Sequence, residues 1–368
     1  MRKSVTLIIL LAFFIHFKTA GQVNTQQQKV LLDSLTEAIK HNTYPNVNSI
    51  IVSKAGKQVY EQYFNGFKKA PLHDSRSSFK SITSLLIGIA IDKGLIKDVN
   101  QKVYPYFPEY KTFDNYDDRK KSMTIKDLLE MRSGLDCEEF NDTKNCEDDM
   151  VNSNDWVKFS LNLPMKNDPG KVWAYTSCDP MIISGIINHV AHVSIMDFAK
   201  KYLFAPMGIV NYKWTVDPSG NGMTAGSFYI RPDDMLKIGQ MVKDEGVYKG
   251  KRIISARWIK ESTMATIPIP DFSFVKSSRS TIAIPQPTYY GYYWYKEQLK
   301  TKGYTEDLLF ASGNGGQYIM IIKKLDMVIV FTQGNYNDRR AKQAFDIVAR
   351  YILPPYEAVK INTFHNNN

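Results

Sequence analysis

The chain has 368 residues and a formal net charge of +10, with 43% hydrophobic and 23% charged residues. This composition excludes an intrinsically disordered chain and leaves enough apolar material for one large folded domain or two modest ones. Lys and Arg are scattered along the chain and do not form a stripe with aromatic residues, so we expect a basic surface and no nucleic-acid partner.

The N-terminal segment predicts export. Residues 1–21 begin with Arg2 and Lys3, continue with an apolar run over 5–17 and end in small residues. This is the pattern of a cleaved secretory signal, which would leave Gln22 as the first residue. The run is short for a membrane span, and an uncleaved membrane anchor is the alternative. We therefore expect a periplasmic or extracellular protein with no stable membrane span after cleavage.

The chain order of hydrophobic periods predicts strands and helices at both ends and helices between them. Helices are expected over 30–40, 77–94, 124–131, 181–191, 231–245, 256–264 and 339–352, and strands over 48–53, 58–64, 223–230, 289–295, 317–323 and 327–332. A turn that contains Gly56 joins the first two strands. A long loop rich in Pro and Ser is expected over 267–287.

This order predicts the α/β class, of the α+β type: an antiparallel sheet flanked by helices, plus a mostly helical region. The folded domain is expected over 22–360. Its α/β part would be built from two separated stretches, about 22–96 and 223–360, and its helical part from about 97–222. Residues 361–368 are expected to form a polar tail.

The three cysteines permit one disulfide in an exported protein. Cys137 with Cys146 would close a short acidic loop, and Cys137 with Cys178 is the alternative pairing. Neither the cysteines nor the pair His189 and His192 has the neighbouring ligands of a metal site. We therefore expect no metal and no other cofactor.

A serine and a lysine three residues apart open the most apolar helix. Ser77 and Lys80 would share one face of this helix, so that the amine reaches the hydroxyl oxygen and activates it as a nucleophile. A second Ser-x-x-Lys pair, Ser273 and Lys276, falls in the Pro-flanked loop. We expect no helix there to hold the second pair on one face, and no function for it.

Two later motifs supply what an activated serine needs. Tyr175-Thr176-Ser177 precedes an apolar helix, and a Tyr or a Lys with a shifted pKa could take the serine proton. The segment 311–317, Ala-Ser-Gly-Asn-Gly-Gly-Gln, leads into an apolar strand. Its glycines allow close approach, and one N–H from this edge could form an oxyanion hole with the N–H of Ser77. Taken singly, the Tyr is more typical of a core residue than of a catalytic one, and the glycines are typical of a hairpin turn.

In this order, the three motifs resemble the serine β-lactamase and penicillin-binding protein superfamily, most closely its class C-like branch of esterases, peptidases and nylon-oligomer hydrolases. The segments 124–135, 246–254 and 291–294 share the resemblance, which covers nearly all of the mature chain. It implies a β-lactamase/transpeptidase-like fold. It also implies that Ser77 is acylated and then released by water, with Lys80 and Tyr175 sharing the proton transfers. Which of the two is the base stays open.

Two departures from the family pattern bear on the substrate. Ser177 stands where the family often has the Asn of Tyr-x-Asn, and Ala311 stands where penicillin-recognising members have the Lys of Lys-Thr-Gly. The second change removes a cation that would pair with a substrate carboxylate. The expected substrate is therefore a small ester, or an amide or peptide other than a β-lactam. Asn314 is the candidate for the second oxyanion N–H.

The remaining residues expected around the substrate are Ser177, Ser312, Gly313 and Gln317, and the loops 136–149 and 267–287 are expected to rim the pocket. A non-hydrolytic penicillin-binding-like protein that binds cell-wall fragments is the alternative function. An α/β-hydrolase is disfavoured because no Gly-x-Ser-x-Gly motif is found.

Overall fold

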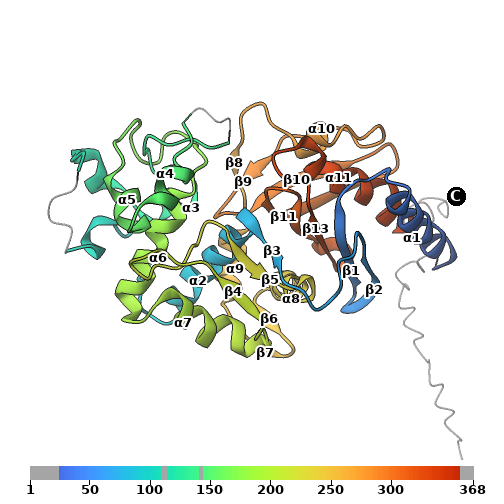
Figure 1. Ribbon diagram of the computed structural model, residues 1–368, viewed down its shortest axis with the longest axis horizontal. Helices are drawn as coiled ribbons and strands as arrows, with labels where there is room; N and C mark the ends of the chain where they lie inside the picture. The colour runs from blue at the N-terminus through green and yellow to red at the C-terminus, as the bar shows by residue number, and fades with distance from the viewer. Residues whose placement is uncertain (1–24, 109–113, 141–143, 357–368) are drawn as a thin grey trace, which may run out of the picture.

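The computed structural model describes residues 25–108, 114–140 and 144–356. The predicted signal segment and polar tail lie outside the described residues. In Figure 1 a sheet with its covering helices occupies one side of the molecule, and a cluster of short helices from the middle of the chain occupies the other. The predicted fold class is confirmed.

The main sheet has eight strands in the order β2-β1-β13-β12-β11-β10-β9-β8, and its paired strands are antiparallel. The strands are β1 (Val47–Lys54), β2 (Lys57–Tyr63), β8 (Ile267–Pro268), β9 (Tyr289–Tyr290), β10 (Tyr295–Lys300), β11 (Thr305–Gly313), β12 (Gln317–Ile322) and β13 (Met327–Gln333). Because β1 pairs with β13, strands from the beginning and the end of the folded chain lie side by side, next to the edge strand β2.

The strand sequences explain this order. All residues of β12 and β13 are buried, as expected for apolar strands covered on both faces, whereas β2 is mostly exposed or half-buried and forms an edge. Ala55 and Gly56 connect β1 to β2 with φ angles of 50° and 72°. Two successive left-handed residues are typical of the tight turn that joins twisted antiparallel strands, which confirms the predicted hairpin.

The helices divide between the two sides. Around the main sheet lie α1 (Thr25–Lys40), α8 (Pro232–Lys243), α9 (Ala256–Ser262), α10 (Phe274–Ser278) and α11 (Gln343–Ile347), and on the helical side lie α3 (Ile125–Leu129), α4 (Glu147–Asn152), α5 (Trp156–Asn162), α6 (Cys178–Ala191) and α7 (Ile195–Ala199). Helix α2 (Phe79–Asp92) contacts α6, α9 and β11. Twelve of its residues are buried, so this helix forms the common core of the two sides.

Short strands complete the frame around α2. A three-stranded sheet has the order β3 (His73–Asp74), β5 (Phe228–Ile230) and β4 (Tyr212–Trp214), and β6 (Val247–Tyr248) pairs with β7 (Lys251–Arg252). Ser75 continues from β3, and both its N–H and its hydroxyl donate to the Phe228 carbonyl oxygen. The chain that enters α2 is thereby fixed to β5.

Three expectations from the sequence need correction. The predicted strand over 223–230 is shorter and covers only β5. The predicted strand over 289–295 breaks between β9 and β10, where Tyr293 has a left-handed φ of 64°. The loop over 267–287 contains α10, so the expectation that Ser273 lacks a helix is wrong. Ser273 is its N-cap, and its hydroxyl accepts a hydrogen bond from the Lys276 N–H.

Candidate active site

Ser77 lies in a single 3-10 turn, Arg76–Ser78, that leads directly into α2. The preceding residue, Arg76, has a left-handed φ of 48°. Asp74 holds this conformation, because its carboxylate accepts from the Arg76 N–H at 2.9 Å and pairs with Arg76 Nε at 2.9 Å. A non-glycine residue held in this region is backbone strain of the kind that clusters at functional sites. Here it lies immediately before the half-buried Ser77.

Lys80 is 2% exposed and its Nζ contacts three oxygen acceptors. It donates to Ser77 Oγ at 2.9 Å, to the Ala225 carbonyl oxygen at 2.7 Å and to Ser177 Oγ at 3.3 Å. Three acceptors match the three protons of an ammonium group. Burial lowers the pKa of Lys80, and the nearby charge of Glu139 partly opposes this by raising it. The predicted pairing of Ser77 with Lys80 is therefore present.

Tyr175 lies near Ser77 in space, although it is distant from it in the sequence. Its hydroxyl lies near enough to the side chains of Ser77 and Tyr295 to interact with both. Lys80 Nζ lies 4.8 Å from the centre of the Tyr175 ring, so the amine also contacts the aromatic face. Burial raises the pKa of the Tyr175 hydroxyl. The structure thus brings together the three residues expected to act on the substrate.

Gly313 brings the end of β11 against the turn that carries Ser77. A Cβ atom added to Gly313 would lie 2.5 Å from the Ser75 carbonyl oxygen and 3.1 Å from the Ser78 nitrogen. Only glycine permits this approach, and the Gly313–Asn314 peptide therefore lies beside the serine. The Asn314 side chain is bound to Asn337 through two hydrogen bonds of 2.7 and 2.9 Å. That the backbone N–H of Asn314 serves an oxyanion stays a prediction.

The other predicted site residues have different surroundings. Ser312 is half-buried, and its side chain interacts with that of Tyr318, the residue paired with it on β12. Gln317 is 1% exposed and donates to the Gln333 carbonyl oxygen at 2.6 Å and to that of Asn314 at 3.4 Å. Gln317 therefore braces the turn around Asn314 from inside the protein, and it does not form a wall of the site.

Ser177 is also buried, and its partner is a residue that the motifs did not predict. Glu139 accepts from the Ser177 N–H at 2.6 Å, from Ser177 Oγ at 2.8 Å and from Thr176 Oγ1 at 3.2 Å. Burial raises the pKa of Glu139, and the charge of Lys80 and the Ser177 N–H partly offset this. Because the Ser177 hydroxyl lies between Glu139 and Lys80, it is not free to bind a substrate carbonyl.

The loop that carries Glu139 is closed by the disulfide Cys137–Cys146. Cys178 is buried and unpaired, so the alternative pairing of Cys137 with Cys178 is excluded. The covalent closure spans nine positions of the chain and includes Glu139 and Phe140. Residues 141–143 of this loop lie outside the described residues.

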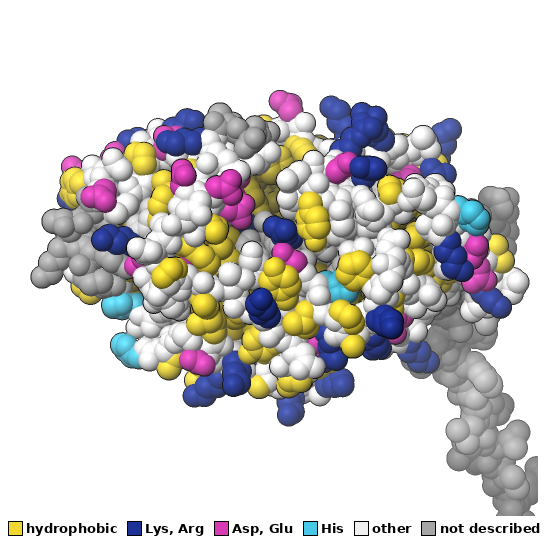
Figure 2. All heavy atoms as spheres, in the orientation of Figure 1, with side chains coloured by type: hydrophobic (Ala, Val, Ile, Leu, Met, Phe, Trp, Pro, Cys, Tyr) yellow, Lys and Arg dark blue, Asp and Glu magenta, His cyan; other side chains and the backbone are white. Residues whose placement is uncertain are grey.

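Aromatic rings form one wall beside Tyr175. The ring of Phe140 contacts those of Trp173 and Phe272 with centroid distances of 5.2 and 4.7 Å, and Trp173 contacts Tyr290 at 5.6 Å. Phe140 and Phe272 come from the two loops that were expected to rim the site. Figure 2 shows hydrophobic side chains gathered along the junction between the helical side and the sheet side.

The second Ser-x-x-Lys pair has no comparable surroundings. Ser273 Oγ donates to Glu297 at 2.6 Å, and the same carboxylate accepts from the Phe274 and Val275 N–H groups. These bonds fix the start of α10 against β10. Ser273 therefore has a structural role in the described chain, as the sequence predicts, although a helix is present.

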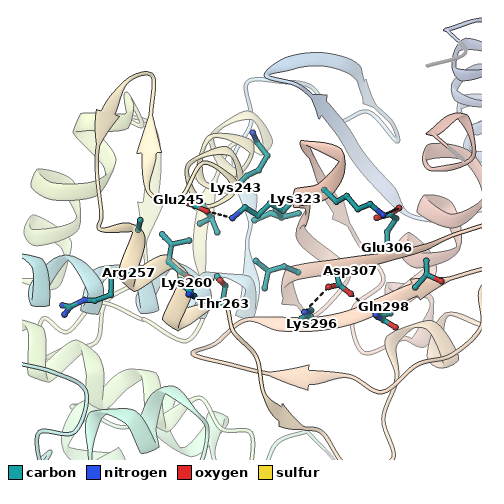
Figure 3. A pocket seen from close by; sticks show the side chains of 17 residues that line it. Lys243, Glu245, Arg257, Lys260, Thr263, Lys296, Gln298, Glu306, Asp307 and Lys323 are labelled. Atoms are coloured by element: carbon teal, nitrogen blue, oxygen red, sulfur yellow. Dashed lines mark hydrogen bonds and ion pairs between the residues drawn. The ribbon is translucent and has the colours of Figure 1, made fainter. Parts of the chain in front are cut away.

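A separate groove of about 1020 Å³ lies on the sheet face between α8, α9 and β10–β12. Figure 3 shows two ion pairs among the side chains that line it, Glu245 with Lys323 and Asp307 with Lys296. Ser77, Lys80 and Tyr175 are not among the residues that line it. The groove is thus distinct from the candidate active site.

No metal site accompanies the serine. Within the part of the chain that the structure describes, no cluster of three or more His, Cys, Asp or Glu side chains is placed to hold a metal ion. His189 and His192 are both exposed. The described ranges also contain no single helix that is long and apolar enough to cross a membrane; α6 and the following segment Ile195–Met207 reach that length and composition only as a pair bent by 78°.

Comparison with known proteins agrees with this geometry. The β-lactamase family matches residues 43–351. The chain is 24% identical over 298 residues to a 6-aminohexanoate-dimer hydrolase from Paenarthrobacter ureafaciens, covering 77% of this chain and 71% of that protein.

Two solved structures share the fold. A family VIII carboxylesterase has a TM-score of 0.63 at 17% identity and covers 88% of this chain and 97% of its own. An octameric penicillin-binding protein homologue from Pyrococcus abyssi has a TM-score of 0.65 at 17% identity and covers 87% of this chain and 76% of its own. The family match spans most of the sequence and includes every residue of the site described above. The chain therefore belongs to the β-lactamase family and is a serine hydrolase.

Proposed function

We propose that this protein is an exported enzyme that hydrolyses an ester or amide bond in a small molecule through an acyl-enzyme on Ser77. The observation that carries the proposal is the convergence of two groups on Ser77: Lys80 Nζ donates to Oγ at 2.9 Å, and the Tyr175 hydroxyl lies near enough to interact with the same side chain. A serine hydroxyl becomes a useful nucleophile only when a neighbouring group removes its proton. Two such groups are in contact with it here.

Lys80 is the better base of the two in the free enzyme. Burial lowers the pKa of Lys80 and raises that of Tyr175, so loss of a proton near neutral pH is easier for the amine than for the phenol. In the proposed first step, Lys80 Nζ takes the proton from Ser77 Oγ while this oxygen bonds to the substrate carbonyl carbon. The N–H groups of Ser77 and Asn314 stabilise the negative carbonyl oxygen.

Tyr175 then has the role of passing a proton to the leaving group. Its hydroxyl lies near Ser77 and is neutral, so it can donate to a leaving oxygen or nitrogen and recover a proton from Lys80. Water attacks the acyl-enzyme in the second half of the cycle, with the same two residues returning the proton to Ser77. No step needs a metal or another cofactor.

The surroundings favour an uncharged, apolar acyl group. Phe140, Trp173 and Phe272 supply a half-buried aromatic wall next to Tyr175. Ala311, in the place of a lysine, offers no charge to a β-lactam carboxylate, and the Ser177 hydroxyl is engaged by Glu139 and Lys80. The relative named for 6-aminohexanoate dimers and the structural neighbour named as a carboxylesterase support amide or ester cleavage and leave the natural substrate to be found.

Labelling with a fluorophosphonate tests this function. We expect one label per chain on Ser77, located by peptide mass spectrometry, and none in Ser77→Ala. Turnover of p-nitrophenyl esters should exceed that of a chromogenic cephalosporin. A folded protein that takes no label would instead be a non-hydrolytic binding protein, and turnover of the cephalosporin at rates typical of a dedicated β-lactamase would refute the substrate class.

Export is part of the same proposal. The apolar N-terminal segment supports it, and so does the disulfide Cys137–Cys146, because disulfides persist in oxidising compartments. Fractionation of expressing cells and N-terminal sequencing of the mature protein would test it. We expect the protein outside the cytoplasm with Gln22 first; an intact Met1 in the cytoplasmic fraction would contradict export.

A further inference from the structure

Glu139 is tied to the catalytic segment by its main chain as well as its side chain. Its N–H donates to the Tyr175 carbonyl oxygen at 2.8 Å, and its carboxylate accepts both the N–H and the hydroxyl of Ser177. The Ser177 oxygen in turn accepts from Lys80 Nζ at 3.3 Å. A continuous chain of hydrogen bonds therefore runs from Glu139 through Ser177 and Lys80 to Ser77.

The charge of Glu139 complements that of Lys80. Four titratable side chains act on the buried amine: Glu139, Glu147, Cys178 and the hydroxyl-bearing Tyr175. Burial raises the pKa values of Cys178 and Tyr175, so both are neutral at ordinary pH, and Glu147 lies on the exposed surface of α4. Glu139 is thus the carboxylate that faces Lys80 from inside the site, one hydroxyl group away.

We propose that Glu139 is a positioning residue for the hydrolysis described above, which holds Ser177 as an acceptor for Lys80 and stabilises the ammonium ion that forms when Lys80 takes the serine proton. In that step the Ser77 O–H bond breaks, an N–H bond forms on Lys80 and the serine oxygen bonds to the carbonyl carbon. Positive charge appears on Nζ as negative charge appears on the carbonyl oxygen. The Glu139 carboxylate accepts three hydrogen bonds from Thr176 and Ser177, as an ionised group does, and it exchanges no proton in this step.

A carboxylate fixed one hydroxyl group away from Lys80 stabilises the transition state more than the resting enzyme. Water can solvate an exposed ammonium, but Lys80 is 2% exposed, and a buried cation needs an internal partner. The Ser177 hydroxyl transmits the effect because it accepts from Lys80 and donates to Glu139 at once. This inference rests on the proposed function, and Glu139 touches none of the reacting atoms.

The test compares fluorophosphonate labelling rates of Ser77 across pH in the full-length protein. The variants are Glu139→Gln, Glu139→Asp and the control Asp148→Asn, which removes an exposed charge from the same loop region. We expect Ser77 in Glu139→Gln to be labelled about 10- to 100-fold more slowly than in the wild type. This loss is smaller than the full rate contribution of a general acid–base group. Glu139→Asp should recover part of the rate, and Asp148→Asn should match the wild type.

The pH profile separates positioning from a merely structural role. The labelling rate rises with pH as Lys80 loses its proton, and the charge of Glu139 raises the pKa of Lys80. Removing that charge in Glu139→Gln should therefore move the rising limb to lower pH, whereas Glu139→Asp should leave it close to the wild-type position. A Glu139→Gln variant whose rate is unchanged, or falls equally at every pH, would overturn the inference.

A second variant covers the case in which Glu139→Gln does not fold. Ser177→Ala keeps the charges of Glu139 and Lys80 and removes the bridging hydroxyl. The labelling rate of Ser77 should therefore fall, while the rising limb of its pH profile stays near the wild-type position. An unchanged rate in Ser177→Ala would refute positioning through Ser177. If Ser77 takes no label in the wild type, both the proposed function and this inference are wrong. If the wild type is labelled and Glu139→Gln is labelled at the same rate, only this inference is wrong.

Discussion

The rings of Phe140 and Phe272 meet edge-on, with their centroids 4.7 Å apart. Phe140 belongs to the loop closed by the disulfide, and Phe272 belongs to the long segment before α10. Both rings are half-buried, and the Phe140 ring lies 6.1 Å from that of Tyr175. This contact therefore joins the helical side to the sheet side at the place where an acyl group would enter.

Shortening one of these rings should reduce acceptance of longer acyl groups. In Phe140→Ala we expect kcat/KM for a p-nitrophenyl hexanoate to fall about 5- to 10-fold, since an aromatic contact contributes about 1 kcal/mol beyond simple burial. The value for p-nitrophenyl acetate should change less. Tyr116→Ala, which removes an exposed ring elsewhere, serves as the control. An equal loss on both esters would argue against an acyl-binding wall.

Gly313 offers a second prediction. Gly313→Ala would place a methyl group 2.5 Å from the Ser75 carbonyl oxygen, so β11 must move away from the Ser77 turn. We expect a loss of esterase activity of about 10²-fold or more from a displaced oxyanion N–H, and a loss of about 1–3 kcal/mol in the free energy of unfolding.

Gly250→Ala is the matched control for Gly313→Ala. Gly250 has a left-handed φ of 77° and open space around its Cα, so alanine there adds strain without touching the site. The free energy of unfolding of Gly250→Ala should be about 1 kcal/mol lower than that of the wild type, with its esterase activity unchanged. Full activity in Gly313→Ala would show that the Asn314 peptide has no role near the serine.

The disulfide should support both stability and activity. In Cys137→Ala/Cys146→Ala we expect the free energy of unfolding to fall by about 2 kcal/mol, because a short covalent loop constrains the unfolded chain. The labelling rate of Ser77 should also fall, because the loop holds Glu139 and Phe140. A phosphine reductant should reproduce both effects in the wild type and have no effect on the variant. A reduced wild type with full labelling rate would contradict the coupling.

His73 should make the protein less stable in mild acid. It is 4% exposed, and burial lowers its pKa from 6.5 to about 4, so the native protein keeps it neutral where the unfolded chain is protonated. The unfolded state therefore gains a proton as pH falls from 6.5 to 4, and stability drops over that window by roughly 3 kcal/mol. Below pH 4 both states are protonated and the loss ends.

Denaturant unfolding at pH 7 and pH 4.5 measures this effect. His73→Phe keeps a ring next to Phe67 and removes the titration, so its stability should decline less between the two pH values. His189→Asn, an exposed change, should decline like the wild type. The same decline in His73→Phe would assign the acid sensitivity to other groups.

The parts of the site that follow from local geometry were predictable from the sequence. Ser77 and Lys80 are three residues apart at the start of one helix, and the structure places Nζ within 2.9 Å of Oγ. Gly313 was predictable as a point of close approach because glycine is the residue type that such contacts require. Tyr175 needed the family's motif order, since a single tyrosine before a helix is also typical of a core.

Glu139 could not be predicted, because its partner Ser177 is 38 positions away and the adjacent Glu138 is chemically identical. Only the folded loop selects between them. The break between β9 and β10 occurs at Tyr293, which has a left-handed backbone conformation. The surrounding run of aromatic residues does not predict this conformation. β11 alternates exposed and buried residues at its start. Because several of these residues are charged, the sequence of this strand resembles a polar segment and was not predicted as a strand.

The pairing of β1 with β13 has a practical consequence. Helix α1 lies beside the last described turn, and Gln28 donates to the Tyr356 hydroxyl at 2.8 Å, so both ends of the described chain emerge on one side. In Figure 1 this side is the far end from the helical cluster that carries Glu139 and Tyr175. A carrier or a solid support attached at either end of the described chain would therefore be held on the side away from the helical cluster.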